Sequence, residues 1–367
     1  MDAPAPSSDG SVRDRSDFPR SESTSPRPRR ILIAGGTGTI GRATVATLAA
    51  RGHEVVCLVR PRSGKQAASR PNSEPKHRAP ADQVRGVGLP AGVEVRFCEI
   101  TDPVSLHEQG LRNERFDAIV SCLASRTGEP RDAWAIDHQA NLNLLQAGKA
   151  AGATQMVLLS AICVQRPRLA FQQAKLAFES ALTDSGLTYS IVRATAFFKS
   201  LSGQIERVRQ GKPYLLFGDG RLTACKPISD RDLAAYLADC LDDAALQNRI
   251  LPIGGPGPAI TPLEQGEFLF DLLGREPRFK QVPVALIKNI AAALGAAGKV
   301  FPPLAVKAEL ARIGHYYATE SMLVLDPVTG RYDADATLET GRDTLFDYYR
   351  RVVEGADTVE RGEHAVF

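Results

Sequence analysis

The chain of 367 residues is long enough for one large α/β domain and a smaller additional region. A formal net charge of +3, with no long basic stripe, argues against nucleic acid as a partner. The six cysteines have no paired CxxC spacing and no histidine-rich neighbourhood, so we expect reduced core thiols and no metal site. The sequence contains no uninterrupted apolar stretch of about 18 residues, which argues against a bilayer span.

Residues 1–29 are rich in Pro, Ser, Asp and Arg, a composition that predicts a disordered tail. This tail lacks the apolar segment of a signal peptide, and its scattered acidic residues are atypical of organelle transit peptides. We therefore expect a bacterial, cytoplasmic protein.

A short apolar strand, 31–35, runs into a turn in which Gly35, Gly38 and Gly41 are spaced three apart. The turn opens a predicted helix over 40–50, and a second strand follows at 54–59. In this context the three glycines allow a sharp turn, close approach of a pyrophosphate, and tight packing of helix on strand. The pattern predicts a dinucleotide site in which the helix N-terminus faces the phosphates.

The second strand is followed by Arg60, Arg62, Ser63 and Lys65, where NAD-selective sites place a carboxylate. Guanidinium groups suit a ribose 2′-phosphate, so we expect NADPH to be the cofactor, with Arg60 as the main phosphate ligand and Arg62 or Ser63 assisting.

Strand and helix patterns alternate over 30–255, and several strands are apolar throughout, which predicts a doubly wound parallel sheet covered on both faces. The expected strands are 31–35, 54–59, 94–98, 117–122, 155–160, 189–193 and 250–253. Residues 61–92 interrupt this rhythm and predict a mobile surface loop. A mostly helical substrate region is expected over 256–355, with helices at 263–273, 284–297 and 343–353, a proline-rich break at 301–303, and a tail over 356–367.

The segment from Phe171 to Lys175 resembles the Tyr-x-x-x-Lys pair of an atypical short-chain dehydrogenase/reductase, with the tyrosine replaced by phenylalanine. Lys175 is the expected catalytic residue, because it can hold the nicotinamide ribose, whereas Phe171 has no proton to donate. Carbonyl reduction needs such a donor beside the substrate oxygen, so the missing hydroxyl favours reduction of a conjugated carbon–carbon double bond.

Further short sequence segments, spread over about 30–355, match one family. They are the run 158–165, the segment 192–201, Gly211-Lys212-Pro213-Tyr214, Phe217-Gly218-Asp219-Gly220, Ala224-Cys225-Lys226-Pro227-Ile228-Ser229 and 320–326. Together they resemble the NADPH-dependent divinyl (proto)chlorophyllide 8-vinyl reductases, which also carry phenylalanine in place of the tyrosine. The resemblance implies a Rossmann-type fold and reduction of an exocyclic vinyl group on a magnesium tetrapyrrole, with peripheral contact to a pigment-bearing membrane as a further expectation.

The expected cofactor-binding residues are Gly35, Thr37, Gly38, Thr39, Ile40, Gly41, Arg60, Arg62, Ser63, Ile100, Leu123, Ala124, Ser160 and Lys175. The expected substrate-binding residues are Phe171, Phe197, Phe198 and Lys226. The candidate proton donors are Tyr189, Tyr214, Cys163 and Tyr316. The apolar stripe Leu286, Ile287, Ile290 and Leu294 is a candidate macrocycle wall or membrane contact, with core packing as the alternative.

Two other functions stay open at this point. One is an isoflavone-reductase-like or quinone-directed NADPH reductase, which would be distinguished by its lack of activity on a divinyl substrate. The other is a non-catalytic, NADP-binding assembly factor for photosynthetic complexes, against which the retained Lys175 argues. The accepted macrocycle, the proton donor and the oligomeric state also stay open.

Overall fold

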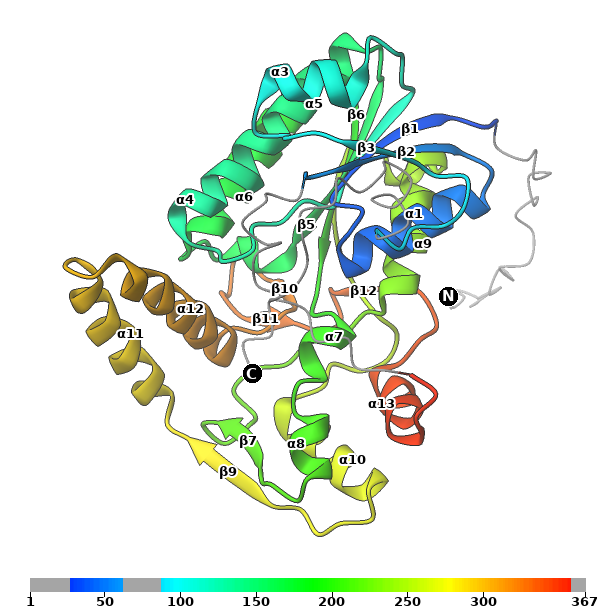
Figure 1. Ribbon diagram of the computed structural model, residues 1–367. Coiled ribbons are helices and arrows are strands. Elements are labelled where there is room, and N and C mark those ends of the chain that lie inside the picture. Colours follow the sequence, from blue (N-terminus) through cyan, green and yellow to red (C-terminus); the bar gives the residue numbers. More distant parts are fainter. Residues whose placement is uncertain (1–26, 62–86, 358–367) are drawn as a thin grey trace, which may run out of the picture.

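The structure, a computed structural model, describes residues 27–61 and 87–357 (Figure 1). The predictions for the tail over 1–26, for most of the loop over 61–92 and for residues 358–367 lie outside these residues.

A sheet of eight parallel strands forms the centre of the molecule, in the order β12-β8-β6-β5-β4-β1-β2-β3. The strands are β1 (Arg30–Ala34), β2 (Glu54–Val59), β3 (Glu94–Phe97), β4 (Ala118–Ser121), β5 (Gln155–Ala161), β6 (Thr188–Ala194), β8 (Arg249–Gly254) and β12 (Leu338–Glu339). The seven strands predicted from apolar runs are present close to their expected bounds. The doubly wound parallel sheet is confirmed, and β12 is an addition that the sequence did not indicate.

Helices cover both faces of this sheet (Figure 1). One face carries α1 (Thr39–Ala50) and α9 (Asp230–Asp242), and the other carries α5 (Asn141–Ala150) and α6 (Ala170–Thr183). Successive strand residues point to opposite faces, so Ile33 joins the apolar cluster beneath α1 while Leu32 joins the cluster beneath α5. Shorter helical elements complete the layers: α3 (Pro103–Ser105), η2 (Leu106–Leu111), α4 (Pro130–Ala133), η3 (Trp134–Ala140), η4 (Ile162–Gln165) and η5 (Ala244–Leu246).

A smaller lobe lies beyond the carboxyl ends of the strands (Figure 1). It contains α7 (Phe198–Leu201), α8 (Ile205–Arg209), β7 (Tyr214–Phe217), α10 (Pro262–Leu272), β9 (Phe279–Val282), β10 (Val324–Leu325), β11 (Tyr332–Asp333) and α13 (Leu345–Glu354). The expected boundary at residue 255 does not separate two units in space. Strand β7, before it, pairs with β9, after it, and β12 returns to pair with β8 in the main sheet.

Two long antiparallel helices, α11 (Val284–Gly298) and α12 (Pro302–Thr319), project as a hairpin at one side of this lobe (Figure 1). The sequence analysis predicted α11 but treated the proline pair after Phe301 as a break and proposed no helix after it. That omission was wrong, because prolines are well tolerated in the first turn of a helix, whose N–H groups have no intrahelical partner.

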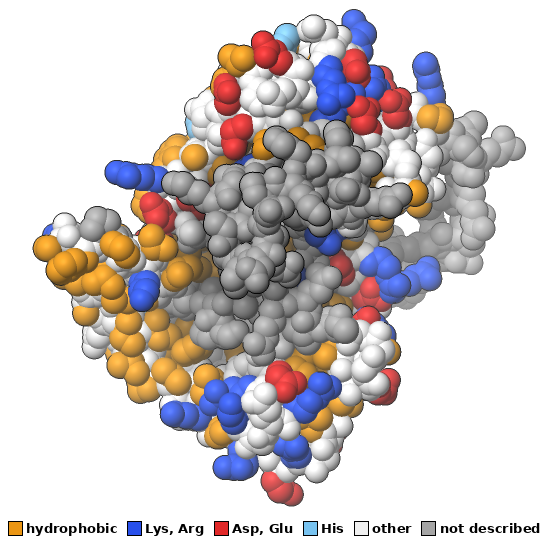
Figure 2. All heavy atoms as spheres, viewed as in Figure 1, with side chains coloured by type: hydrophobic (Ala, Val, Ile, Leu, Met, Phe, Trp, Pro, Cys, Tyr) orange, Lys and Arg blue, Asp and Glu red, His pale blue; other side chains and the backbone are white. Residues whose placement is uncertain are grey.

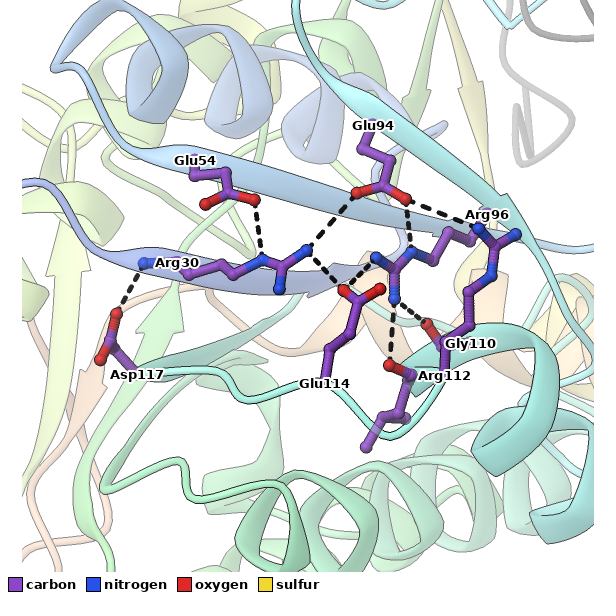
Figure 3. A network of polar contacts seen from close by, with 9 residues as sticks. Arg30, Glu54, Glu94, Arg96, Gly110, Arg112, Glu114 and Asp117 are labelled. Atoms are coloured by element: carbon purple, nitrogen blue, oxygen red, sulfur yellow. Dashed lines mark hydrogen bonds and ion pairs between the residues drawn. The ribbon is translucent and has the colours of Figure 1, made fainter.

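A network of charged side chains lies at the amino-terminal edge of the sheet, where β1, β2 and β3 begin (Figure 3). The guanidinium of Arg96 is 1% exposed, lies 2.8 Å from Glu94 and also binds Glu114 and two carbonyl oxygens of η2. Arg30 contributes a second guanidinium, 2.8 Å from Glu54 and also bound to Glu114. The buried guanidinium of Arg96 is thus fully paired with partly exposed carboxylates and carbonyl oxygens, so the charges at this edge serve the structure.

Candidate functional site

The glycine turn lies at the carboxyl end of β1, beside the end of β4, where the strand order reverses. Gly35 has φ +80°, and a Cβ there would lie 2.4 Å from the carbonyl oxygen of Cys122. A Cβ on Gly41 would lie 2.1 Å from the carbonyl oxygen of Gly35, so the helix packs directly on the turn. Both positions therefore require glycine.

In front of this turn the backbone is open. Thr37 and Gly38 are exposed, Thr39 is half-buried, and Ile40 anchors α1 in the core. A Cβ on Gly38 would meet only the oxygen of Gly35, at 3.6 Å. An open glycine cradle at the N-terminus of a helix, placed at the switch point of a parallel sheet, fits the pyrophosphate of a dinucleotide.

Arg60 follows β2 directly. Of the three residues predicted to bind the 2′-phosphate, it is the one that the structure describes. Its side chain is 55% exposed, and its Nε lies 3.8 Å from Glu99 Oε2. A mostly exposed guanidinium with one distant, partly exposed carboxylate is available to an anion. Arg62 and Ser63, predicted to assist it, lie outside the described residues.

Three other expected cofactor-binding residues follow β3 and β4. Ile100 is buried, and its carbonyl oxygen accepts a hydrogen bond of 3.0 Å from Asn143. Leu123 is half-buried and Ala124 is exposed, directly beyond the end of β4 and beside the glycine turn. Their place at the carboxyl edge agrees with a role against the cofactor, which stays a prediction.

Lys175 lies on α6 and is not a solvated surface lysine. Its side chain is 11% exposed, and its Nζ lies 2.9 Å from Oδ1 of Asp137, a fully buried carboxylate on η3. Oδ2 of Asp137 has no hydrogen-bond partner among the described residues. The ion pair holds the ammonium in place at the carboxyl edge of β4 and β5. Asp137 was missed from the sequence, which contains no motif that pairs it with Lys175.

Phe171, one turn before Lys175, is buried and belongs to an apolar cluster that joins α6 to α12. From α12 this cluster takes Ile313 and Tyr316, and from η4 it takes Cys163. Phe171 therefore helps to fix the wall of the site, and its contact with substrate stays a prediction.

Ser160 was expected to contact the cofactor, but its hydroxyl is directed elsewhere. It is buried and donates to Glu179, which also forms an ion pair with Arg193. Its hydrogen satisfies a buried carboxylate, which leaves only the oxygen's lone pairs for another partner, and its contact with the cofactor stays a prediction.

Three expected substrate contacts have different outcomes. Phe198 is 5% exposed and packs in the core of the smaller lobe against Tyr348, with 5.5 Å between the ring centroids, which argues against the expected contact with substrate. Lys226 was expected to bind substrate. It is buried and its Nζ lies 2.7 Å from Glu339, so its ammonium is already paired. Phe197 is half-buried, and its role stays a prediction.

Lys199, next to these phenylalanines, was not singled out from the sequence. Its Nζ lies 2.8 Å from Oγ1 of Thr39, the first residue of α1. The ammonium thus reaches from the smaller lobe to the glycine turn. Its position in the short helix α7, directly after β6 at the ligand-binding edge of such sheets, is the signal that could have found it.

The candidate proton donors separate clearly. Tyr189 lies near the amino end of β6, at the wrong edge of the sheet, and Tyr214 is buried in the smaller lobe against Phe279. Burial raises the pKa of Tyr214 far above its usual range. Tyr316 is also buried, and its hydroxyl donates to the carbonyl oxygen of Cys163 at 2.8 Å. The predictions for Tyr189 and Tyr214 are wrong, and Cys163 lies at the site edge.

Comparison with known proteins agrees with this geometry. A family described as NAD(P)H-binding matches residues 35–244. The chain is 49% identical to divinyl chlorophyllide a 8-vinyl-reductase of Oryza sativa subsp. indica, over 94% of this chain and 84% of that protein. It is 46% identical to the Arabidopsis thaliana protein of the same name, over 98% and 85%.

Among solved structures, a complex of leucoanthocyanidin reductase from Vitis vinifera with NADPH superposes with a TM-score of 0.60 at 16% identity, covering 89% of this chain and 99% of that one. At this identity the likeness concerns the fold alone. The glycine cradle, the placement of Lys175 and the near-complete match to two plant reductases lead to one assignment: the chain belongs to the divinyl chlorophyllide a 8-vinyl-reductase family, within the NAD(P)H-binding short-chain dehydrogenase/reductase fold.

Proposed function

We infer that this protein reduces the 8-vinyl group of a divinyl chlorophyllide to an ethyl group in chlorophyll or bacteriochlorophyll synthesis, with NADPH as reductant. The observation that carries the inference is Lys175, held by Asp137 beside a glycine cradle, in a chain that is nearly half identical to reductases of that name. NADPH supplies the hydride. The pyrophosphate would be held by Gly35, Gly38 and the N-terminus of α1.

The protein's own groups position the reactants. The ammonium of Lys175 would bind the ribose hydroxyls and keep positive charge near the reacting ring, while its pairing with Asp137 restricts its rotation. The apolar residue Phe171 leaves no hydroxyl at the position where carbonyl reductases hold one. This agrees with a substrate whose conjugated macrocycle itself delocalises the negative charge that develops during the transfer.

The test is anaerobic incubation of the purified protein with NADPH and divinyl chlorophyllide, followed by absorbance. A blue shift of the Soret band with matching NADPH oxidation is expected. A parallel incubation with divinyl protochlorophyllide determines which macrocycle is preferred. NADPH oxidation with a quinone but with neither tetrapyrrole would contradict the inference and favour a quinone-directed reductase.

The α11–α12 hairpin is proposed as the apolar wall for the macrocycle. Core packing does not account for its stripe, because Ala291 is the buried residue of α11, while Leu286 and Ile290 are 50% and 45% exposed. Figure 2 shows hydrophobic side chains gathered over these two helices. Replacing Ile287 and Ile290 with asparagine should raise the KM for the tetrapyrrole and leave NADPH affinity unchanged. A joint fall in both affinities and in Tm would contradict this role.

The tip of the hairpin is proposed to contact an anionic membrane surface from the cytoplasmic side. Val300 and Phe301 are 72% and 62% exposed, and the chain from Glu276 to Glu309 carries five cations and no acidic residue in between. Among the described residues, no helix is long and apolar enough to cross a bilayer, so the contact would be peripheral. Each cation near an anionic surface contributes about 1 kcal/mol.

Flotation with lipid vesicles tests this contact. The protein should float with vesicles containing phosphatidylglycerol, less so at high salt, and not with phosphatidylcholine alone. A variant with glutamate at both Val300 and Phe301 should stay in the soluble fraction while reducing detergent-dispersed substrate normally. Equal flotation of this variant would contradict the assignment of the tip.

A further inference from the structure

Tyr317, on α12, places a hydroxyl at the edge of the site. The sequence analysis did not consider this residue. Its oxygen lies 3.9 Å from Sγ of Cys163, and its side chain is 36% exposed. Its neighbour Tyr316 is 4% exposed and donates its hydrogen to the carbonyl oxygen of the same cysteine. The two adjacent tyrosines therefore have different roles: Tyr316 is bonded within the core, while Tyr317 borders open space.

The position of Cys163 places Tyr317 close to Lys175. Cys163 lies in η4, directly after β5, and packs with Phe171 and Ala174 of α6, the turn that carries Lys175. The charge of Lys175 acts on this thiol, although burial still raises the pKa of Cys163. Through its contact with Cys163, Tyr317 thus lies beside the cluster in which Phe171 stands in place of the expected tyrosine.

The other described tyrosines are unsuitable as donors at this site. Tyr189 lies at the opposite edge of the sheet, and Tyr214 is enclosed in the smaller lobe. The hydroxyl of Tyr332 is held 2.6 Å from Glu320. The remaining tyrosines lie on α9 or α13, at Tyr236, Tyr348 and Tyr349.

We propose that Tyr317 is the proton donor that completes reduction of the vinyl group; this rests on the vinyl reductase function proposed above. One carbon of the vinyl group receives the hydride from NADPH as the π bond breaks. The electron pair of that bond then takes the proton of the Tyr317 hydroxyl, forming the second C–H bond as the O–H bond breaks. Burial raises the pKa of the Tyr317 hydroxyl well above its usual range, so the phenolate formed in this step promptly regains a proton from water, which reaches the 36% exposed residue.

The experiment compares Tyr317→Phe with the matched control Tyr316→Phe, each of which removes one hydroxyl from the same helix turn. Loss of a general acid costs about 10²-fold or more in rate, so kcat of Tyr317→Phe should fall by that factor. Its KM for divinyl chlorophyllide, its NADPH Kd and its Tm should match the wild type. Tyr316→Phe should lower Tm and keep most of kcat.

A chemical rescue separates proton donation from a structural role. Turnover of Tyr317→Phe should rise with the concentration of a small buffer acid, and turnover of the control should not. Unchanged kcat in Tyr317→Phe, or an equal loss in both variants without rescue, would overturn the proposal. If the wild type is active, these two results contradict only the role of Tyr317 and agree with the vinyl reductase function. An inactive wild type would contradict the vinyl reductase function itself.

Discussion

Replacing Gly35 with alanine tests whether the close approach of the glycine turn to β4 positions the cofactor cradle. The matched control is Gly52→Ala. Both glycines have a positive φ, +80° and +84°, so both variants bear the cost of a left-handed alanine, about 1–2 kcal/mol. A Cβ at Gly52 meets nothing within 4 Å, whereas at Gly35 it would meet the Cys122 oxygen at 2.4 Å and the Leu123 nitrogen at 2.8 Å.

The contact at Gly35 involves backbone on both sides, so neither partner can turn away as a flexible side chain would. Overpacking of this kind costs about 1–3 kcal/mol, in addition to the cost of the backbone conformation. Gly35→Ala should therefore lose about 2–5 kcal/mol of unfolding free energy, and Gly52→Ala about 1–2 kcal/mol.

Urea unfolding measures these losses, and quenching of protein fluorescence by NADPH measures the affinity. The strand and turn must separate to admit the methyl group at Gly35, so NADPH affinity should fall sharply in that variant and stay unchanged in the control. Equal destabilisation of the two variants, with NADPH affinity intact in both, would refute the reasoning.

Three further predictions concern single side chains. Arg60→Ala should weaken NADPH binding by about 1.5–3 kcal/mol and leave NADH binding nearly unchanged in a titration; equal weakening of both would show that Arg60 does not contact the 2′-phosphate. Lys175→Ala should cut turnover about a hundredfold through misplaced reactants, while Phe171→Tyr should not raise it; steady-state kinetics on both variants decide this. Glu114 has its pKa held below the usual 4.5 by the hydrogen bond from Arg96, so its contribution to stability is present above that pH and is lost as the pH falls. The difference in unfolding free energy between wild type and Glu114→Gln should therefore be constant near neutral pH and shrink below pH 4.5, and a constant difference at acid pH would contradict the assignment.

The sequence predicted the sheet well because its strands are short apolar runs ended by glycine and polar residues. The glycine turn was predictable for the same reason, since the signal is local. The pairing of Lys175 with Asp137 was not, because it joins two helices brought together only by packing on β4 and β5. Helix α12 was missed because two prolines at its first turn resemble a break, and Tyr317 was missed with it.

The same limit applies to Ser160 and Lys226, whose partners the sequence did not indicate. Ser160 lies at the carboxyl end of β5 and Lys226 in the segment after β7, and both are polar side chains of a kind that often contacts ligands. In the structure each is bound by a carboxylate from another segment: Ser160 by the buried Glu179, and Lys226 by the exposed Glu339. A side chain's type and position show that it can bind a ligand, but whether another part of the protein already binds it depends on tertiary structure.

The two-residue strand β12 has a consequence for how the chain reaches its fold. It pairs with β8, Thr340 donates to the carbonyl oxygen of Gly254, and Glu339 binds Lys226. During synthesis the other seven strands leave the ribosome long before β12, so the end of β8 at Ile253 and Gly254 stays unpaired until residue 340 has emerged. An unpaired edge strand is a site of aggregation. A chain ending before Leu338 would leave this end of β8 unpaired, so even a two-residue strand protects part of the sheet edge against aggregation while the protein folds.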